Sequence, residues 1–155
     1  MKKIAVMIMA AFSALMMVSC DKYEDGRPQK SVINEFKRMY PDAFDVEWEW
    51  QGTSWEVSFE TGKRPNGIEH EAWYDTDGNW IRTETDLLLA NVPQNIKDYL
   101  AADPTYGNAY NTDHDVDYIQ TPDGEYYRFE LLVGGVQVRV DVTPDGKVTL
   151  ANGLF

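Results

Sequence analysis

The sequence between residues 31 and 150 contains two copies of one pattern, and this repeat limits the possible folds more than any other feature. In each copy, an amphipathic helical segment precedes four short segments with the alternation typical of strands. The prolines that end the helical segments, Pro41 and Pro104, lie 63 positions apart, and the last turn glycines, Gly78 and Gly146, lie 68 apart. The offset changes only within predicted loops, where insertions and deletions are tolerated. The pattern therefore predicts two tandem α-β-β-β-β units.

Repeat 1, residues 31–86, begins with a helix that Pro41 ends. Ser31 is a candidate N-cap, and Val32 and Phe36 fall on one helical face. Alternation of apolar and polar residues then predicts four half-buried strands. These strands are expected over residues 44–50, 55–60, 68–74 and 80–84, with a longer loop at 61–67 and a hairpin turn at Asp77-Gly78.

Repeat 2, residues 92–150, follows the same plan. Pro93 suits the first turn of a helix, in which Ile96, Tyr99 and Leu100 share a face. Its strands are expected over residues 115–120, 125–132, 136–142 and 147–150, with an insertion at 106–111 and tight turns at 123–124, 134–135 and 145–146.

Consecutive strands joined by short turns predict an antiparallel sheet. Its apolar face needs a cover, which the two helices can provide, so we expect an α+β fold with both helices on one face. The other face would remain open to water. By alternation, the open face is expected to carry Glu47, Glu49, Glu56, Glu69, Glu71, Trp73, Tyr126, Arg128, Glu130, Arg139 and Asp141.

The N-terminal residues have the layout of a bacterial lipoprotein signal. Two lysines precede an apolar run that ends at Val18, and Ser19 then precedes Cys20, the only cysteine. The run of about fifteen apolar residues is shorter than the roughly 20 that a membrane-spanning helix needs. An ordinary signal peptide cleaved near Ser13-Ala14 is the alternative. The predicted segments are a signal peptide over 1–19, a lipidated Cys20 with a polar tether over 20–30, and a tandem domain over 31–150.

A lipidated cysteine predicts a protein anchored in the cell envelope, most simply in the outer membrane of a Gram-negative bacterium. Both the periplasmic and the cell-surface orientation remain open. The formal charge is −12, and loss of residues 1–19 removes two lysines and no acid, which gives −14. This charge argues against nucleic acid as a partner and against flat docking on anionic lipid.

The sequence offers no recognisable catalytic, cofactor or metal site. His70 and His114 lie far apart, and His70 shares the phase of Ala72, which favours a partly buried structural histidine. The segment 75–79 contains two aspartates, but its glycine falls fourth rather than sixth, so a hairpin turn is favoured over a calcium loop. We therefore expect a protein that is not an enzyme.

The aromatic residues point to an interaction surface. All five tryptophans lie between residues 48 and 80. Trp73 is out of phase with its neighbours and is expected to project from the open face, and Tyr126 holds the corresponding phase in repeat 2. Exposed aromatic residues beside arginine are typical anchors of protein interfaces and can also stack on sugars. An incidental surface aromatic is the simplest alternative. The predicted partner-binding residues are Glu71, Trp73, Tyr126, Arg128 and Arg139.

Three features of the sequence resemble a known family. They are the hairpin from Tyr74 to Trp80, the matching hairpin from Val142 to Val148, and the Val92-Pro93 pair before the second helix. The chain from about residue 31 to 150 resembles the PepSY-like, beta-lactamase-inhibitor-protein-like (BLIP-like) domains of secreted bacterial proteins. The resemblance implies tandem α/β units with an exposed, often concave sheet, and a non-catalytic role in binding or inhibiting another protein, commonly a secreted hydrolase. The expected function is thus an anchored binding protein, with a glycan-binding accessory lipoprotein as the alternative.

Overall fold

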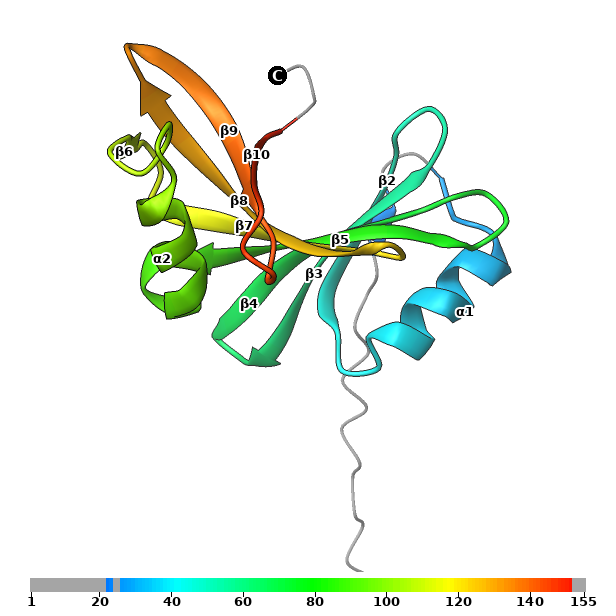
Figure 1. Ribbon diagram of the computed structural model, residues 1–155. Coiled ribbons are helices and arrows are strands. Elements are labelled where there is room, and N and C mark those ends of the chain that lie inside the picture. The colour runs from blue at the N-terminus through cyan, green and yellow to red at the C-terminus, as the bar shows by residue number, and fades with distance from the viewer. Residues whose placement is uncertain (1–21, 24–25, 152–155) are drawn as a thin grey trace, which may run out of the picture.

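The computed structural model describes residues 22–23 and 26–151, which form one ten-stranded sheet and two α-helices (Figure 1). The predicted signal peptide and Cys20 lie outside the described residues. The elements are β1 (Lys22–Tyr23), α1 (Lys30–Met39), β2 (Phe44–Trp50), β3 (Trp55–Lys63), β4 (Asn66–Tyr74), β5 (Trp80–Leu88), a 3₁₀ turn η1 (Leu89–Asn91), α2 (Gln94–Ala102), β6 (Tyr110–Asn111), β7 (Asp115–Thr121), β8 (Gly124–Val133), β9 (Val136–Val142) and β10 (Val148–Leu150).

The strand order β1-β2-β3-β4-β5-β7-β8-β9-β10 follows the chain, and β6 pairs with β8 beside this path. Every described strand pair is antiparallel except β1 with β2. The two repeats join through the β5–β7 ladder, which runs from Thr83 opposite Gln120 to Leu88 opposite Asp115. One continuous sheet therefore spans both repeats.

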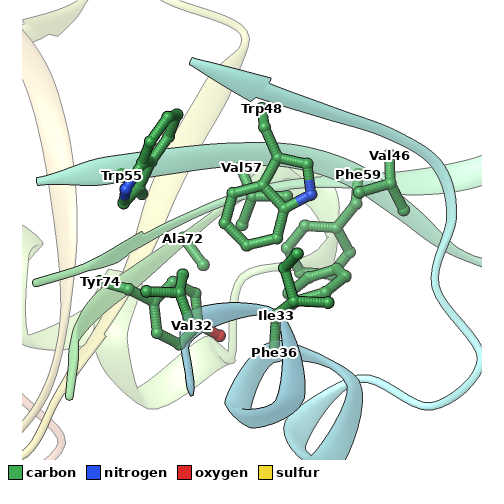
Figure 2. Close-up of a cluster of buried hydrophobic side chains, with 10 residues drawn as sticks. All are labelled: Val32, Ile33, Phe36, Val46, Trp48, Trp55, Val57, Phe59, Ala72 and Tyr74. Atoms are coloured by element: carbon green, nitrogen blue, oxygen red, sulfur yellow. The ribbon is translucent and has the colours of Figure 1, made fainter. Parts of the chain in front are cut away.

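An aromatic core holds α1 against β2–β5. Phe36 makes edge-on contacts with Trp48 at 5.3 Å and with Phe59 at 5.0 Å between ring centroids. Figure 2 shows these side chains between the helix and the strands, together with Tyr74. Edge-on geometry is the arrangement that aromatic pairs prefer, because the positive ring edge meets the negative face. The alternation seen in the sequence thus produces a well-packed first core.

A second, more aliphatic core lies under α2. Ile96 of the helix packs with Val116 of β7, Phe129 of β8 and Val140 of β9. At the far end of the helix, the ring of Tyr99 approaches Gly146, where an added Cβ would come within 3.0 Å of the ring. The predicted face of Ile96, Tyr99 and Leu100 therefore does meet the sheet, although Tyr99 remains partly exposed.

Both helices cover the same face of the sheet. On β5, Thr83 lies opposite Ala72 of the first core, and Leu87 lies opposite Val116 of the second core. Thr83 and Leu87 are four residues apart on one strand, so their side chains point to the same side. Figure 1 places the two helices at opposite ends of that side. The predicted α+β architecture, with one covered and one open face, is confirmed.

Ser31 does not cap α1, contrary to the prediction. The N-cap position is Gln29, without a side-chain cap bond, and Ser31 lies in the first turn of the helix. Its backbone packs against Gly78, where an added Cβ would lie 2.9 Å from the Ser31 carbonyl carbon. Gly78 also has a φ of +97°, so the turn needs glycine for both conformation and space.

The predicted loop at 61–67 is wrong, because β3 and β4 continue through it as a paired hairpin. Thr61 lies opposite Ile68 and Gly62 opposite Gly67, which leaves a short turn at Arg64-Pro65. The ladder includes Gly62 and Gly67 as a pair and ends at Lys63 opposite Asn66, so Pro65 lies in the turn. Strand β5 is also longer than predicted, since it continues to Leu88 along β7.

Part of the predicted tether packs on the domain. Lys22 and Tyr23 pair in parallel with Glu47 and Trp48 of β2. Pro28 is buried, and the Gln29 side chain accepts a hydrogen bond from the Trp55 indole at 3.0 Å. The chain therefore reaches the edge of the sheet within three residues of Cys20.

Candidate docking face

The open face is the side of the sheet that neither helix covers. Register and alternation place the predicted residues on it, together with several others that the sequence reasoning did not single out. The additional members are Ser58, Glu60, Arg82, Glu84, Asp86, Asp117, Ile119 and Gln137.

Trp73 lies on the open face as predicted, but its predicted exposure is wrong, because only 9% of its surface is accessible. Its ladder neighbours are Glu56 on β3 and Arg82 on β5. The indole donates a hydrogen bond to Glu56 at 2.9 Å, and the Arg82 guanidinium lies 3.9 Å above the ring. Two charged side chains therefore cover the ring and fix its position.

Tyr126, the counterpart of Trp73 in repeat 2, is half-buried on the open face. Its ladder partner Ile119 has no accessible surface, although it belongs to neither core. A buried isoleucine on this side means that the surrounding side chains form a closed layer there. Sequence alternation alone gives no signal for this coverage.

Arginine–carboxylate pairs neutralise the open face in repeat 2. Arg128 binds both carboxylate oxygens of Asp141, at 2.8 and 3.0 Å, and Arg139 binds Glu130 at 3.0 Å. Gln137 donates a further hydrogen bond to Glu130 at 2.8 Å. Arg128 and Asp141 are both largely buried, and such fork-like pairing is geometrically specific. The three predicted residues Tyr126, Arg128 and Arg139 thus belong to one ordered polar layer.

The open face in repeat 1 carries an excess of negative charge instead. Arg82 pairs with Glu84 at 3.0 Å and also covers Trp73. In the described part of the chain, no cation forms an ion pair with Glu69, Glu71 or Asp86. These three acids therefore lie close to other carboxylates without an ion-pair partner of their own among the described residues.

The pKa values of several carboxyl groups on the open face are raised. Partial burial raises the pKa of Glu71, and the charges of Glu56, Glu84 and Asp86 raise it further. Burial, with the charges of neighbouring acids, also raises the pKa of Asp86. At the junction of the repeats, burial beside Glu84 and Asp86 raises the pKa of Asp117 to about 6. Each shift means that the folded protein disfavours the ionised carboxylate.

Two adjoining hollows lie at the repeat 1 end of this surface. The first hollow has a volume of about 260 Å³, and its walls carry Asp45, Glu47, Glu60, Glu69, Glu71 and Asp86. The second hollow measures about 330 Å³, and its walls include Ile68, Glu69, Asp86, Leu88, Asn91 and Asp115. Glu69 and Asp86 belong to both, so the hollows share one wall.

His70 is a structural residue on the helix-covered face. Its ring nitrogens form hydrogen bonds with Thr61 at 2.7 Å and Thr85 at 2.8 Å, and its ring stacks on Phe59. Burial lowers its pKa, which favours the neutral imidazole. This environment agrees with the predicted structural role.

The segment 75–79 forms a hairpin turn. The Asp75 carboxylate accepts hydrogen bonds from the backbone N–H groups of Asp77 and Asn79, and those bonds lower its pKa together with the Asn79 side chain. Within residues 22–23 and 26–151, no group of three or more His, Cys, Asp or Glu is arranged to hold a metal ion. The same residues contain no helix long and apolar enough to cross a membrane.

The chain belongs to the PepSY-like family, described as "Putative beta-lactamase-inhibitor-like, PepSY-like". The family model matches residues 53–150. The match covers most of repeat 1 and all of repeat 2. It confirms the resemblance to this family stated above. Among curated proteins, no sequence matches this chain.

Solved structures share the fold at low sequence identity. A BLIP-like protein from Bacteroides fragilis is 23% identical with a TM-score of 0.69, over 80% of this chain and 84% of that one. A DUF2874 family protein from Bacteroides ovatus is also 23% identical, with a TM-score of 0.66 over 81% and 89% of the two chains. A "putative periplasmic" protein from Bacteroides eggerthii is 23% identical, with a TM-score of 0.63 over 79% and 86%. These likenesses concern the architecture of the domain.

Proposed function

We propose that this protein is a non-catalytic binding protein of the bacterial cell envelope, which docks a protein partner on its open face. The observation that carries the proposal is a sheet spanning both repeats with one face left uncovered by either helix. The solvated side of an antiparallel sheet is commonly polar. This face instead carries covered aromatic rings, ordered ion pairs and two hollows.

The composition of the face supports a protein as partner. Interfaces are enriched in tyrosine and arginine, and Tyr126, Arg82 and Arg128 lie on this side, with Arg82 stacked on the covered ring of Trp73. Hydrogen bonds and cation–π contacts hold these side chains in place, which lowers the conformational entropy lost on binding. The family description, beta-lactamase-inhibitor-like, favours a secreted hydrolase as the class of partner.

Glycan binding receives less support from the same face. A sugar-binding aromatic presents an open ring, whereas Arg82 and Glu56 occupy the surroundings of Trp73. We therefore propose that the open face binds a protein rather than a glycan.

The proposed location is the outer membrane, through lipid on Cys20. The lipoprotein signal in the sequence supports this anchor, and the parallel pairing of Lys22 with Glu47 supports a short distance between the anchor and the sheet edge. An anchored binding protein would meet partners that reach the same membrane surface.

The test is capture of partners from envelope extract by the tagged full-length protein and two variants. Ser58→Arg adds a long cation to the middle of the open face, between Glu47 and Glu71 in the ladder. Asn34→Arg adds the same charge to the exposed side of α1. We expect Ser58→Arg to lose the captured protein and Asn34→Arg to retain it. Equal capture by both folded variants would refute the open-face proposal.

A further inference from the structure

The sheet splits where β4 leaves β5. Their ladder begins at Tyr74 and Trp80 and ends at His70 and Thr85, although β4 starts at Asn66 and β5 continues to Leu88. Beyond His70, β4 stays with β3, and β5 stays with β7. Figure 1 shows the β3–β4 hairpin diverging from β5 and β7. The two hollows meet at this split, because Glu69 and Asp86 on the separating strands line both.

Exposed apolar side chains lie within the second hollow. Ile68 is 49% accessible and Leu88 is 57% accessible, and both line its walls. Exposed apolar surface bordered by charged residues is characteristic of interaction sites on soluble proteins. The first hollow, in contrast, is lined mainly by carboxylates. The groove formed by the two hollows therefore offers an apolar contact at one end and acids along its length.

The two acids that both hollows share, Glu69 and Asp86, have no ion-pair partner among the described residues. Arg64 forms an exposed ion pair with Asp45 at the rim, and no ion pair reaches Glu69 or Asp86 in the described residues. Partial burial, and after it repulsion by neighbouring acids, raises the pKa of Asp86 and of Glu71. A cation placed between these acids would relieve the repulsion, so the groove is electrostatically complementary to positive charge.

We infer that the groove binds a segment of a partner protein in which lysine or arginine residues flank an apolar side chain. This inference rests on the proposed protein-binding function and specifies the partner's chemistry. The apolar side chain enters the second hollow against Leu88, and the flanking cations lie between Glu69, Asp86 and Glu71. The acids further into repeat 2 do not offer the same site, because Arg128 pairs with Asp141 and Arg139 pairs with Glu130.

A direct test measures binding of two labelled peptides to the full-length protein by fluorescence anisotropy. One peptide has the sequence Gly-Lys-Leu-Lys-Arg-Gly, and the other replaces its leucine with serine. The groove variant is Glu69→Gln/Asp86→Asn, and the control is Asp42→Asn/Asp123→Asn, which removes two exposed acids elsewhere. We expect the groove variant to weaken the leucine peptide about tenfold at low salt, and the control to weaken it about twofold or less.

The apolar contact has its own comparison. Leu88→Ser should weaken the leucine peptide about threefold or more and leave the serine peptide unchanged, since only the former buries a side chain there. Equal weakening by the groove and control variants would mean that net charge alone attracts the peptides, and would overturn the inference. An unchanged affinity of the leucine peptide for the Leu88→Ser variant would also overturn the inference.

Failure of this inference and failure of the proposed function are distinguishable. If the peptides ignore the groove while Ser58→Arg still abolishes capture from the envelope, the open face binds a partner of different chemistry. If the peptides bind the groove and Ser58→Arg leaves capture intact, the groove chemistry is correct and the proposed function is wrong.

Discussion

The two halves of the open face share the same strand framework but differ in how their charged side chains are paired. In repeat 2, Arg128 and Arg139 neutralise Asp141 and Glu130, and the polar layer is complete in itself. In repeat 1, one arginine, Arg82, is surrounded by acids and covers Trp73. The comparison teaches that two halves of one sheet can differ in charge, with paired acids in one half and acids that lack an ion pair in the other.

The largest expected effect concerns the covered aromatic ring of repeat 1. Trp73→Ala should lower the free energy of unfolding by about 3 kcal/mol, because a nearly buried indole and its contacts with Glu56 and Arg82 are lost. Tyr126→Ala, at the half-buried counterpart, should cost about 1–2 kcal/mol. Urea denaturation of both variants provides the measurement. An equal or larger loss for Tyr126→Ala would contradict the assigned difference between the two rings.

The next effect concerns the ion pairs of repeat 2. Arg128→Met should destabilise the fold by about 2 kcal/mol, since it leaves Asp141 and Asp117 largely buried without their cation. Arg64→Met breaks the exposed pair with Asp45 and should change stability by about 0.5 kcal/mol or less. Thermal unfolding of the two variants in parallel measures this contrast. If both arginines proved equally dispensable, repeat 2 would not be the neutralised scaffold described above.

At the junction of the halves, Asp117→Asn should stabilise the protein. The folded-state pKa of Asp117 is raised to about 6 from an ordinary value of 3.8, so the ionised form costs stability above pH 6. That cost shrinks as the pH falls through 6 and disappears below the unfolded pKa. With screening by solvent and the loss of attraction to Arg128, we expect a gain of about 1–2 kcal/mol at pH 7.

The check is chemical denaturation of wild type and Asp117→Asn at about pH 7 and about pH 3.5, below the unfolded pKa. Asp123→Asn, at an exposed turn, serves as the control and should have little effect at either pH. A variant less stable than wild type at pH 7 would show that the attraction between Asp117 and Arg128 outweighs the burial and repulsion.

The smallest expected effect is a change in the free energy of unfolding that has opposite signs in the two halves. Glu71→Gln should stabilise the protein by about 0.5 kcal/mol or less, because it removes a partly buried charge and its repulsion with neighbouring acids, both reduced by solvent screening. Glu130→Gln should destabilise it by a similar or somewhat larger amount, since Glu130 accepts hydrogen bonds from Arg139 and Gln137. Equilibrium unfolding in urea compares the two. The same sign for both variants would remove the distinction between a repulsive and a neutralised half.

Much of the architecture follows from sequence periodicity. Alternation located the strands, the turn glycines located the hairpins, and the repeat offsets indicated which segments correspond. The hairpin at 61–67 was mispredicted because Gly62, Pro65 and Gly67 are turn residues by composition, whereas cross-strand pairing decides whether a strand continues. The N-cap was mispredicted because Ser31 lies against Gly78 within the first turn, a tertiary contact that local sequence does not encode.

The candidate site was only partly predictable. Alternation assigned Trp73 to the correct face, but its exposure depends on Glu56 and Arg82, whose side chains approach from two other strands. Only the register of both ladders brings them together, and a one-residue shift would place them on the opposite face. The groove was not predicted at all, because it arises where β4 and β5 separate. The partner-binding roles of Glu71, Trp73, Tyr126, Arg128 and Arg139 stay predictions.

The most direct measurement compares how tightly two matched variants bind the partner protein captured from the envelope. The quantity measured is the dissociation constant of each complex, relative to wild type. Ser58→Arg adds a cation to the first hollow in repeat 1, and Gln137→Arg adds one to the open face in repeat 2. Docking on the acidic half predicts a loss of about tenfold or more for Ser58→Arg and a change within about twofold for Gln137→Arg. Equal losses, or a larger loss for Gln137→Arg, would contradict the account.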